Sequence, residues 1–218
     1  MKKLSEKSLG VILVALFLAT LGFSIACTTT PIKESASVKT YVEPSIQPGT
    51  IRSIAIFPIR NVRLQPDELR EINRGITDGF RKQNPQLAIL GATESVKMLN
   101  DAGLAEKYSE FLRNYSQSSI PDVRVLQDIG KALGVNAILQ GEVYGVVQTD
   151  AVRAVEYGKT SLVIRYVLLS TVNAGVLWDS ASSAFKLSSD PGLPAPPLYE
   201  TILVGHDKIL SALPTLAQ

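Results

Sequence analysis

The sequence feature that most constrains this chain is a charge-free apolar run near its start. Leu9 to Ala26 reads LGVILVALFLATLGFSIA and follows Lys2, Lys3 and Lys7. A basic start, an apolar middle and a small residue before a break are typical of an export signal. The run has 18 residues, near the lower limit for a membrane-spanning helix, so an uncleaved N-terminal anchor is a second interpretation. No later stretch is as long without a charge, and we therefore expect the remainder to be a soluble domain.

Cys27 is the only cysteine in the chain and follows this run directly. Ile25-Ala26-Cys27 resembles the end of a lipobox, where bacterial lipoproteins are cleaved and acylated, although Ser24 stands where that motif usually has an aliphatic residue. An exported protein with one unpaired thiol risks intermolecular disulfides, which favours lipidation over an ordinary signal peptide that happens to end near a cysteine. We therefore predict a lipoprotein signal peptide at 1–26 and a lipid, such as palmitate, on Cys27.

The residue after the cysteine bears on location. The residue at this position is Thr28 and not Asp. In Gram-negative lipoproteins, a residue other than Asp here is typical of release to the outer membrane. The predicted location is the cell outer membrane, with the domain lipid-anchored and facing the periplasm.

Cleavage would also change the charge balance. The leader carries three lysines and one glutamate of the 22 basic and 20 acidic side chains, so the mature chain keeps 19 of each. A nucleic-acid-binding protein needs a concentrated basic face. We therefore predict no nucleic-acid partner and expect the membrane to be contacted through the lipid on Cys27.

Residues 27–49 are predicted to be a flexible tether, and residues 50–218 a periplasmic α/β domain. The segment after Cys27, TTTPIKESASVKTYVEPSIQPG, is rich in Thr, Ser and Pro and shows no apolar period. About 20 such residues average roughly 25 Å end to end and reach about 70 Å at most. That length would hold a domain clear of a lipid surface.

The apolar periodicity of the remaining chain predicts an α+β fold with early crossovers and a late antiparallel meander. We expect a mixed sheet of about five strands packed against several helices, in two or three layers. The expected strands are 51–59, 87–90, 135–149, 160–172 and 176–187, with a hairpin turn at 173–175. The expected helices are 66–83, one starting at Thr93 or Glu94, 104–117, one capped by Ser119 or Asp122 and ending at Gly134, and 198–213.

Three residues inside these elements call for an explanation. Gly75 and Gly79 weaken the first helix, and we interpret them as sites of close packing against a sheet in preference to ligand approach. Arg165 interrupts the apolar strand SLVIRYVLL. We expect it to pair with Glu142 or Asp179, because a buried Arg is rarely left alone, and a partner-facing position is the alternative. The apolar character of this strand leaves a subunit interface open.

Catalytic motifs are absent from the sequence. His206 is the only histidine, and we expect it on a solvated helix face. No Gly-x-Ser-x-Gly elbow, no zinc-ligand spacing and no phosphate-binding glycine motif is found. We therefore predict no catalytic, cofactor or metal site and no enzymatic activity, while a hydrolase that uses only carboxylates stays open. SSDPGLPAPP (188–197) is expected to be an irregular connection and not a recognition motif.

Two segments resemble a known group of proteins. The first is the segment RSIAIFPIRNV, which precedes a predicted helix ending GITDGFRKQ. The second is DVRVLQDIGKALGVNAILQGEV, in which a predicted helix ends with Ala-Leu-Gly and is followed directly by a strand. Over roughly residues 51–187 the chain resembles the periplasmic α/β domain of lipoproteins related to the curli-secretion lipoprotein, the lipoprotein activators of penicillin-binding proteins and the N-terminal domain of TolB. The resemblance implies a non-enzymatic domain that forms rings or engages an envelope partner. The curli-type channel also has long membrane-inserting hairpins, for which only Tyr144 to Val167 offers room, and charged residues at its centre suit an exposed turn (Asp150, Arg153 and Glu156).

Three functional hypotheses follow. The first is an outer-membrane-anchored periplasmic lipoprotein that acts as a non-enzymatic binding or assembly module, with a protein partner in the envelope or a homo-oligomer. The second is a subunit of an oligomeric curli-type secretion channel. The third and weakest is a hydrolase acting on envelope polymers.

Overall fold

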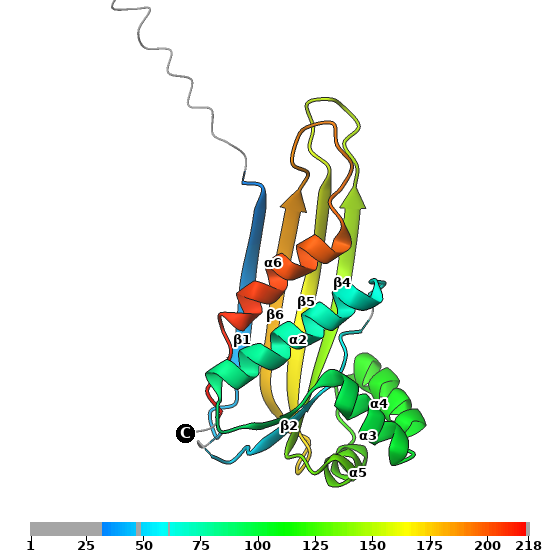
Figure 1. Ribbon diagram of the computed structural model, residues 1–218, viewed down its shortest axis with the longest axis vertical. Helices are drawn as coiled ribbons and strands as arrows, with labels where there is room; N and C mark the ends of the chain where they lie inside the picture. The colour runs from blue at the N-terminus through cyan, green and yellow to red at the C-terminus, as the bar shows by residue number, and fades with distance from the viewer. Residues whose placement is uncertain (1–31, 47–48, 61, 217–218) are drawn as a thin grey trace, which may run out of the picture. The chain divides into compact units, whose positions relative to one another are not determined.

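The computed structural model of the chain describes residues 32–46, 49–60 and 62–216. The chain divides into a unit Met1–Ile32 and a unit Lys33–Gln218, and the second unit contains the folded domain. Within the described residues, a mixed sheet of six strands packs against five helices (Figure 1). The predicted α+β class is confirmed, with six strands where the sequence indicated about five.

The sheet joins a parallel part to an antiparallel part. Its strand order is β1-β6-β5-β4-β2-β3. β2 pairs in parallel with both β3 and β4, whereas β4, β5, β6 and β1 pair in antiparallel fashion. The early crossovers and the late meander are thus confirmed. The strands are β1 Glu34–Val42, β2 Ser53–Ile56, β3 Ala88–Leu90, β4 Ala137–Thr149, β5 Lys159–Ser170 and β6 Val176–Leu187.

β1 is a strand in a segment that was predicted to be part of the tether. The segment 34–42 pairs with β6 over all nine of its residues, so the prediction of a flexible tether over 27–49 and a domain starting at residue 50 is wrong for this segment. The physical reason lies in the residue types. ESASVKTYV contains Val, Thr and Tyr, which favour strands, and its flanking prolines, Pro31 and Pro44, lie outside it. Ala36 and Val38 are half-buried against the sheet's core, and this packing stabilises the strand.

The five helices begin and end close to the predicted positions. They are α2 Pro66–Gln83, α3 Ala92–Asp101, α4 Ala105–Ser118, α5 Val123–Leu133 and α6 Leu198–Leu210. At the start of α5, the Asp122 carboxylate accepts hydrogen bonds from the backbone N–H groups of Arg124 (2.9 Å) and Val125 (3.2 Å). At its end, Gly134 adopts a left-handed conformation with φ of 67°. Of the two predicted caps, Asp122 is therefore confirmed.

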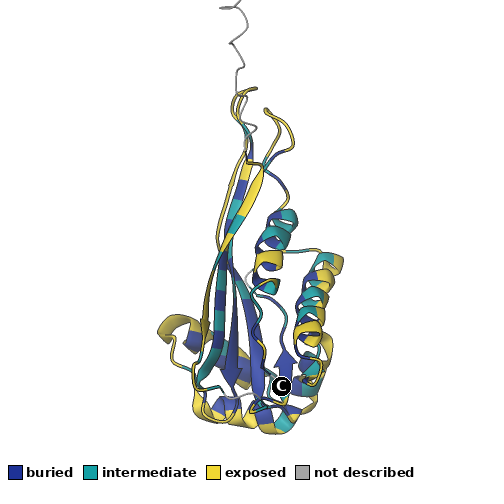
Figure 2. Ribbon diagram, turned by 90° about the vertical axis from the view of Figure 1, so that its left-hand side faces the viewer, coloured by how far each residue is buried: buried dark blue, intermediate teal, exposed yellow. Residues whose placement is uncertain are grey.

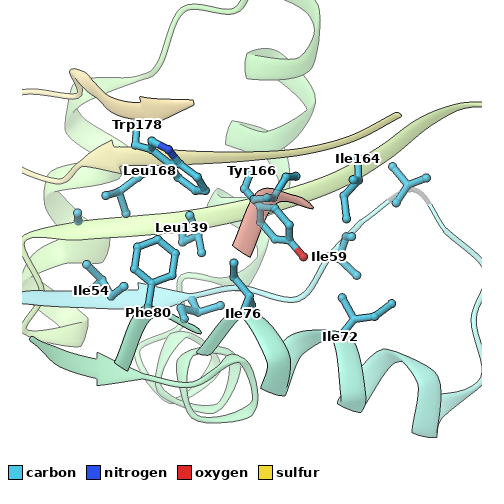
Figure 3. Packing of buried hydrophobic residues seen from close by; sticks show 14 of the residues in the cluster. Ile54, Ile59, Ile72, Ile76, Phe80, Leu139, Ile164, Tyr166, Leu168 and Trp178 are labelled. Atoms are coloured by element: carbon cyan, nitrogen blue, oxygen red, sulfur yellow. The ribbon is translucent and has the colours of Figure 1, made fainter. Parts of the chain in front are cut away.

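α2 and α6 cover one face of the sheet, which we call the first face (Figure 1). Phe80 of α2 meets Trp178 of β6 edge to face, with ring centroids 5.7 Å apart and planes at 86°. Figure 3 shows these rings among apolar side chains that belong to the strands and to α2. The buried residues of this core include Ile54, Ile72, Ile76, Leu139, Ile164, Tyr166, Leu168 and Ile202. Such a continuous core is what makes the antiparallel meander and the two helices one domain.

The two glycines of α2 lie where this helix meets α6. A β-carbon on Gly75 would lie 2.8 Å from Nε2 of His206, and one on Gly79 would lie 2.8 Å from a methyl group of Leu210. The interpretation of Gly75 and Gly79 as close-packing positions is therefore confirmed. The neighbour, however, is the helix α6 and not the sheet.

Candidate functional site

The opposite face of the sheet, which we call the second face, is only partly covered. α3, α4 and α5 pack on it where β2, β4 and β5 contribute Ala55, Ile138, Val167 and Leu169. Towards the Thr149 end of β4, none of the described helices packs on this face, and Figure 2 shows exposed and half-buried residues along the ends of these strands. We call this uncovered part the open face. Its side chains are Ser35, Ser37 and Lys39 of β1, Ala181, Ser183 and Phe185 of β6, Ser161 and Val163 of β5, and Tyr144 of β4.

Charged residues mark the boundary between the covered part and the open face. Arg165 donates two hydrogen bonds to the Asp179 carboxylate, at 2.9 Å from Nε and 2.5 Å from Nη2. Its Nη1 also lies 3.9 Å from Glu142, which in turn lies 3.3 Å from Arg60. We call these four residues the charge ladder. The predicted pairing of Arg165 is confirmed, and it has both of the expected carboxylates as partners.

Arg165 of the ladder stays charged over a wide pH range. The hydrogen bonds to Asp179 raise the pKa of the Arg165 guanidinium above its ordinary value, although burial acts in the opposite direction. Burial raises the pKa of the nearby Tyr115 hydroxyl, while Arg165 lowers it. At neutral pH the Arg165 guanidinium is therefore charged and the Tyr115 phenol is neutral, which suits recognition of a polar partner more than proton transfer.

A row of aromatic rings supports the ladder from α4. Phe57 of the segment after β2 lies 4.4 Å from Tyr108, Tyr108 lies 6.3 Å from Phe111, and Phe111 lies 5.8 Å from Tyr115, centroid to centroid. These rings are buried at the end of the covered part. Stacked rings of this kind pack tightly and fix the position of α4 beside the charges. The boundary of the open face is therefore closely packed.

The surface of the open face is shallow and built mostly from small side chains. A depression there is lined by residues that include Ser35, Ser37, Gly145, Ser161, Val163, Ser183 and Phe185. Lys159 lies over the Phe185 ring, with its ammonium 4.9 Å from the centroid. Small side chains let the backbone or an aromatic ring of a partner approach closely, and Val163 and Phe185 supply apolar area. The arrangement can bind a protein surface.

Beyond the open face, β4 and β5 continue as a hairpin with an exposed turn. The two strands pair as far as Thr149 and Lys159. Val152 and Val155 in the turn are 87% and 79% exposed, and the charged residues predicted for an exposed turn are exposed as well (Asp150, Arg153 and Glu156). The proline-rich loop 188–197 contacts this hairpin, since the N–H of Ala195 donates to the Asp150 carboxylate at 2.7 Å. Its prediction as an irregular connection is confirmed.

His206 is buried in the first-face core, so the prediction of a solvated position is wrong. It is 2% exposed, and its Nδ1 lies 3.1 Å from the hydroxyl of Tyr166. Space for the ring exists because Gly75 of α2 has no side chain. Burial lowers the pKa of His206 to about 4. Its packing between a helix and the sheet keeps the imidazole from a substrate in solvent.

The predicted lipidation site is Cys27, next to the predicted signal peptide. Cys27 and the predicted signal peptide 1–26 lie outside the described residues. Among the residues that the structure does describe, no group of His, Cys, Asp and Glu could hold a metal ion. In the same part of the chain, no helix combines the length and the apolar character needed to cross a membrane.

Comparisons with known proteins gave structural neighbours only. No family model matches the chain, and no curated protein matches its sequence. Similar solved structures include the PelC dodecamer from Paraburkholderia phytofirmans, with 11% identity, a TM-score of 0.46 and coverage of 84% of this chain and 99% of that chain. The lipoprotein GNA1162 from Neisseria meningitidis has 12% identity and a TM-score of 0.40, covering 74% and 99% of the two chains. The LpoB C-terminal domain from Salmonella enterica has 13% identity and a TM-score of 0.38, covering 63% and 87%. Similarity at this level assigns no function, and the relation to periplasmic lipoproteins remains a prediction.

Proposed function

We propose that this chain is a lipoprotein anchored to the outer membrane through Cys27, whose periplasmic domain binds a protein partner through the open face. The observation that carries the proposal is the open face itself. A sheet that is covered by helices along one face but only in part along the other leaves Tyr144, Val163 and Phe185 without a covering layer. An uncovered sheet surface that combines aromatic anchors with small polar side chains, and that is bordered by charges, is typical of protein interaction sites.

The chemistry of the open face favours a binding role over an enzymatic one. The charged groups at its boundary are paired with one another in the ladder, and the only histidine is enclosed in the core. A hydrolase that depends on His206 would require the first-face core to open. A protein partner needs only the existing surface, with Lys39 and Lys159 at its edges available for carboxylates of the partner.

The anchoring part is tested by metabolic labelling with a lipid precursor. The wild-type chain is expected to take up label and to fractionate with the outer membrane. Cys27→Ala is expected to lose the label completely. Equal labelling of the two proteins would contradict lipidation at this residue.

The binding part is tested by photo-crosslinking in the native envelope. A photo-reactive phenylalanine analogue in place of Ser183 on the open face is expected to yield a discrete adduct with one envelope protein. The same analogue in place of Lys131, which is exposed on α5, serves as the matched control and is expected to yield none. Adducts of equal yield at both positions would contradict a role for the open face. Ring-shaped particles of detergent-extracted protein would favour the secretion-channel hypothesis instead.

A further inference from the structure

The outer edge of β1 is the long free edge of the sheet. The strand order places β1 and β3 at the two ends. β3 has three residues, whereas β1 has nine in unbroken register with β6. Proteins protect sheet edges with short strands, prolines, bulges or charged side chains, and of these β1 has only two charged side chains, Glu34 and Lys39. In the part of the chain that the structure describes, no segment pairs with this edge.

The direction of the backbone groups along β1 follows from two hydrogen bonds at its ends. The N–H of Leu187 donates to the carbonyl of Lys33 at 2.7 Å, and the N–H of Glu43 donates to the carbonyl of Leu177 at 2.9 Å. Odd-numbered residues therefore face β6. Because the direction alternates along a strand in an antiparallel ladder, the even-numbered residues of 34–42 direct their N–H and C=O groups outward.

We propose that β1 pairs in antiparallel fashion with β1 of a second copy of this chain, about a two-fold axis at Val38. In this register Val38 faces Val38, Ala36 faces Thr40 and Glu34 faces Val42. Each pair joins two even-numbered residues, so every outward donor meets an acceptor of the other copy. Two sheets of six strands then become one continuous sheet. This pairing uses the outward backbone groups of β1, whereas partner binding at the open face uses side chains of one sheet face, so each proposal is tested by its own variants.

The side chains of β1 favour this register over the two registers that are shifted by one residue pair. Lys39 is the charged residue in the middle of the strand, and here it faces the small Ser37 of the other copy. A shift of one residue pair in one direction places Lys39 opposite Lys39, which is unfavourable for like charges. A shift in the other direction shortens the paired segment from residues 34–42 to residues 34–40. The proposed register combines the longest ladder with no repulsion between like charges.

The helix beside β1 leaves room for a second copy. α6 packs on β6, β5 and β1, and it crosses the first face in front of these strands (Figure 1). In the paired sheet, the two copies of β6 would be separated by three strand spacings, or about 14 Å. Packed helices need about 8–10 Å, so both copies of α6 can lie side by side.

A groove beside α6 supports the same arrangement. It is lined by Ala36 of β1 and by one stripe of α6 that carries the half-buried Leu203 and Val204. Acidic and basic side chains both rim it, namely Glu34, Glu200 and Asp207, and Lys186 and Lys208. A surface with both signs of charge is compatible with its own two-fold copy, which a surface of one sign is not.

The first test removes one outward donor without disturbing the pairing with β6. Val38→Pro lacks the N–H that points outward, and proline is tolerated at a strand edge. The full chain in detergent is expected to sediment as a dimer, and Val38→Pro is expected to weaken dimerisation on the order of tenfold or more, because two hydrogen bonds are lost per dimer. Val38→Ala keeps the N–H and serves as the control for lost side-chain packing. A monomeric wild-type protein at 100 µM, or equal dimerisation of the two variants, would overturn the proposal.

The second test determines the register of the two β1 strands from which residues can form an intermolecular disulfide. In a Cys27→Ser background, Val38→Cys is expected to form an intermolecular disulfide on mild oxidation, because residue 38 faces itself at about 5.5 Å between α-carbons. Ser37→Cys and Lys39→Cys are the matched controls, since each would lie beyond about 7 Å from its own copy, the limit for a disulfide. Efficient crosslinking at Val38→Cys alone supports the two-fold pairing. No crosslink at Val38→Cys, or a dimer that crosslinks equally at all three positions, would refute it.

Discussion

Nδ1 of His206 lies 3.1 Å from the hydroxyl of Tyr166, and its Nε2 faces the backbone of Gly75. The three residues belong to α6, β5 and α2, so one imidazole lies where both helices meet the sheet. Within the described structure, Nε2 has no hydrogen-bond partner. A polar group enclosed in this way is tolerated as a neutral ring, whereas a charged ring would lack a compensating partner.

The first prediction concerns stability at acidic pH. The pKa of His206 falls from 6.5 in the unfolded chain to about 4 in the folded protein because the ring is buried. The unfolded state therefore binds the proton more readily, and stability is lost as pH falls from about 6.5 to about 4. At pH 5 we expect a loss of about 2 kcal/mol in the free energy of unfolding relative to pH 7.5 from this group.

Urea unfolding of the wild type and of His206→Gln at both pH values isolates this contribution. Glutamine can still bond to the Tyr166 hydroxyl but does not titrate, and all other groups are common to the two proteins. The variant should therefore lose about 2 kcal/mol less than the wild type between the two pH values. Parallel pH profiles for the two proteins would show that His206 does not titrate as a buried group.

The second prediction concerns the contact between Gly75 and His206. A methyl group at residue 75 would lie 2.8 Å from Nε2, closer than packed atoms allow. Gly75→Ala gains about 1 kcal/mol of helix propensity but forces the buried ring to shift, which typically costs about 1–3 kcal/mol. We expect net destabilisation in thermal or urea unfolding.

A double-mutant cycle separates the contact from the helix effect. In a His206→Ala background the obstructing ring is absent, so Gly75→Ala is expected to become neutral or stabilising there. Gly79→Ala is a useful comparison, because its neighbour is the flexible end of Leu210 and the expected cost is smaller. If Gly75→Ala had the same effect in both backgrounds, the contact would not be what limits residue 75.

The parts of this fold that were predicted correctly depend on local chemistry. Asp122 and Gly134 act through backbone groups within a few residues, so their roles as caps can be read from a short segment. The partners of Arg165 were predictable because a charge in an apolar strand needs carboxylates and the neighbouring strands supply them. Periodicity likewise indicated β4, β5 and β6 to within two residues at each end.

The errors concern positions that are decided by distant neighbours. The segment 34–42 contains residues that favour strands, but what makes it part of the sheet is a pairing partner about 140 residues further along the chain. His206 is polar, and only the absence of a side chain at Gly75, on another helix, makes its burial possible. The open face was equally inaccessible to prediction, because it follows from where α3, α4 and α5 stop covering the sheet.

The third prediction concerns the N-cap of α5. Asp122→Ala removes the acceptor for the N–H groups of Arg124 and Val125 and is expected to lower the free energy of unfolding by about 1 kcal/mol. Asp122→Asn keeps a side-chain oxygen that can accept the same hydrogen bonds. In the same urea titration, this variant should lose only a small fraction of the unfolding free energy that Asp122→Ala loses. Equal losses for the two variants would mean that charge, not capping, accounts for the effect of Asp122.

The fourth prediction concerns the charge ladder. Arg165→Met keeps the aliphatic stem but leaves Asp179 without its two short hydrogen bonds, and it is expected to cost about 1–2 kcal/mol of stability at low salt. Arg81→Met is the matched control, because Arg81 and its partner Asp78 are 57% and 60% exposed and lie 3.4 Å apart on the surface of α2. Exposed pairs contribute about 0–1 kcal/mol, so this variant should be nearly neutral.

Raising the salt concentration to 1 M should reduce the cost of Arg165→Met only in part, because the hydrogen bonds are partly buried and are screened less than exposed charges. A cost for Arg165→Met no larger than that for Arg81→Met would show that the ladder does not stabilise the boundary of the open face.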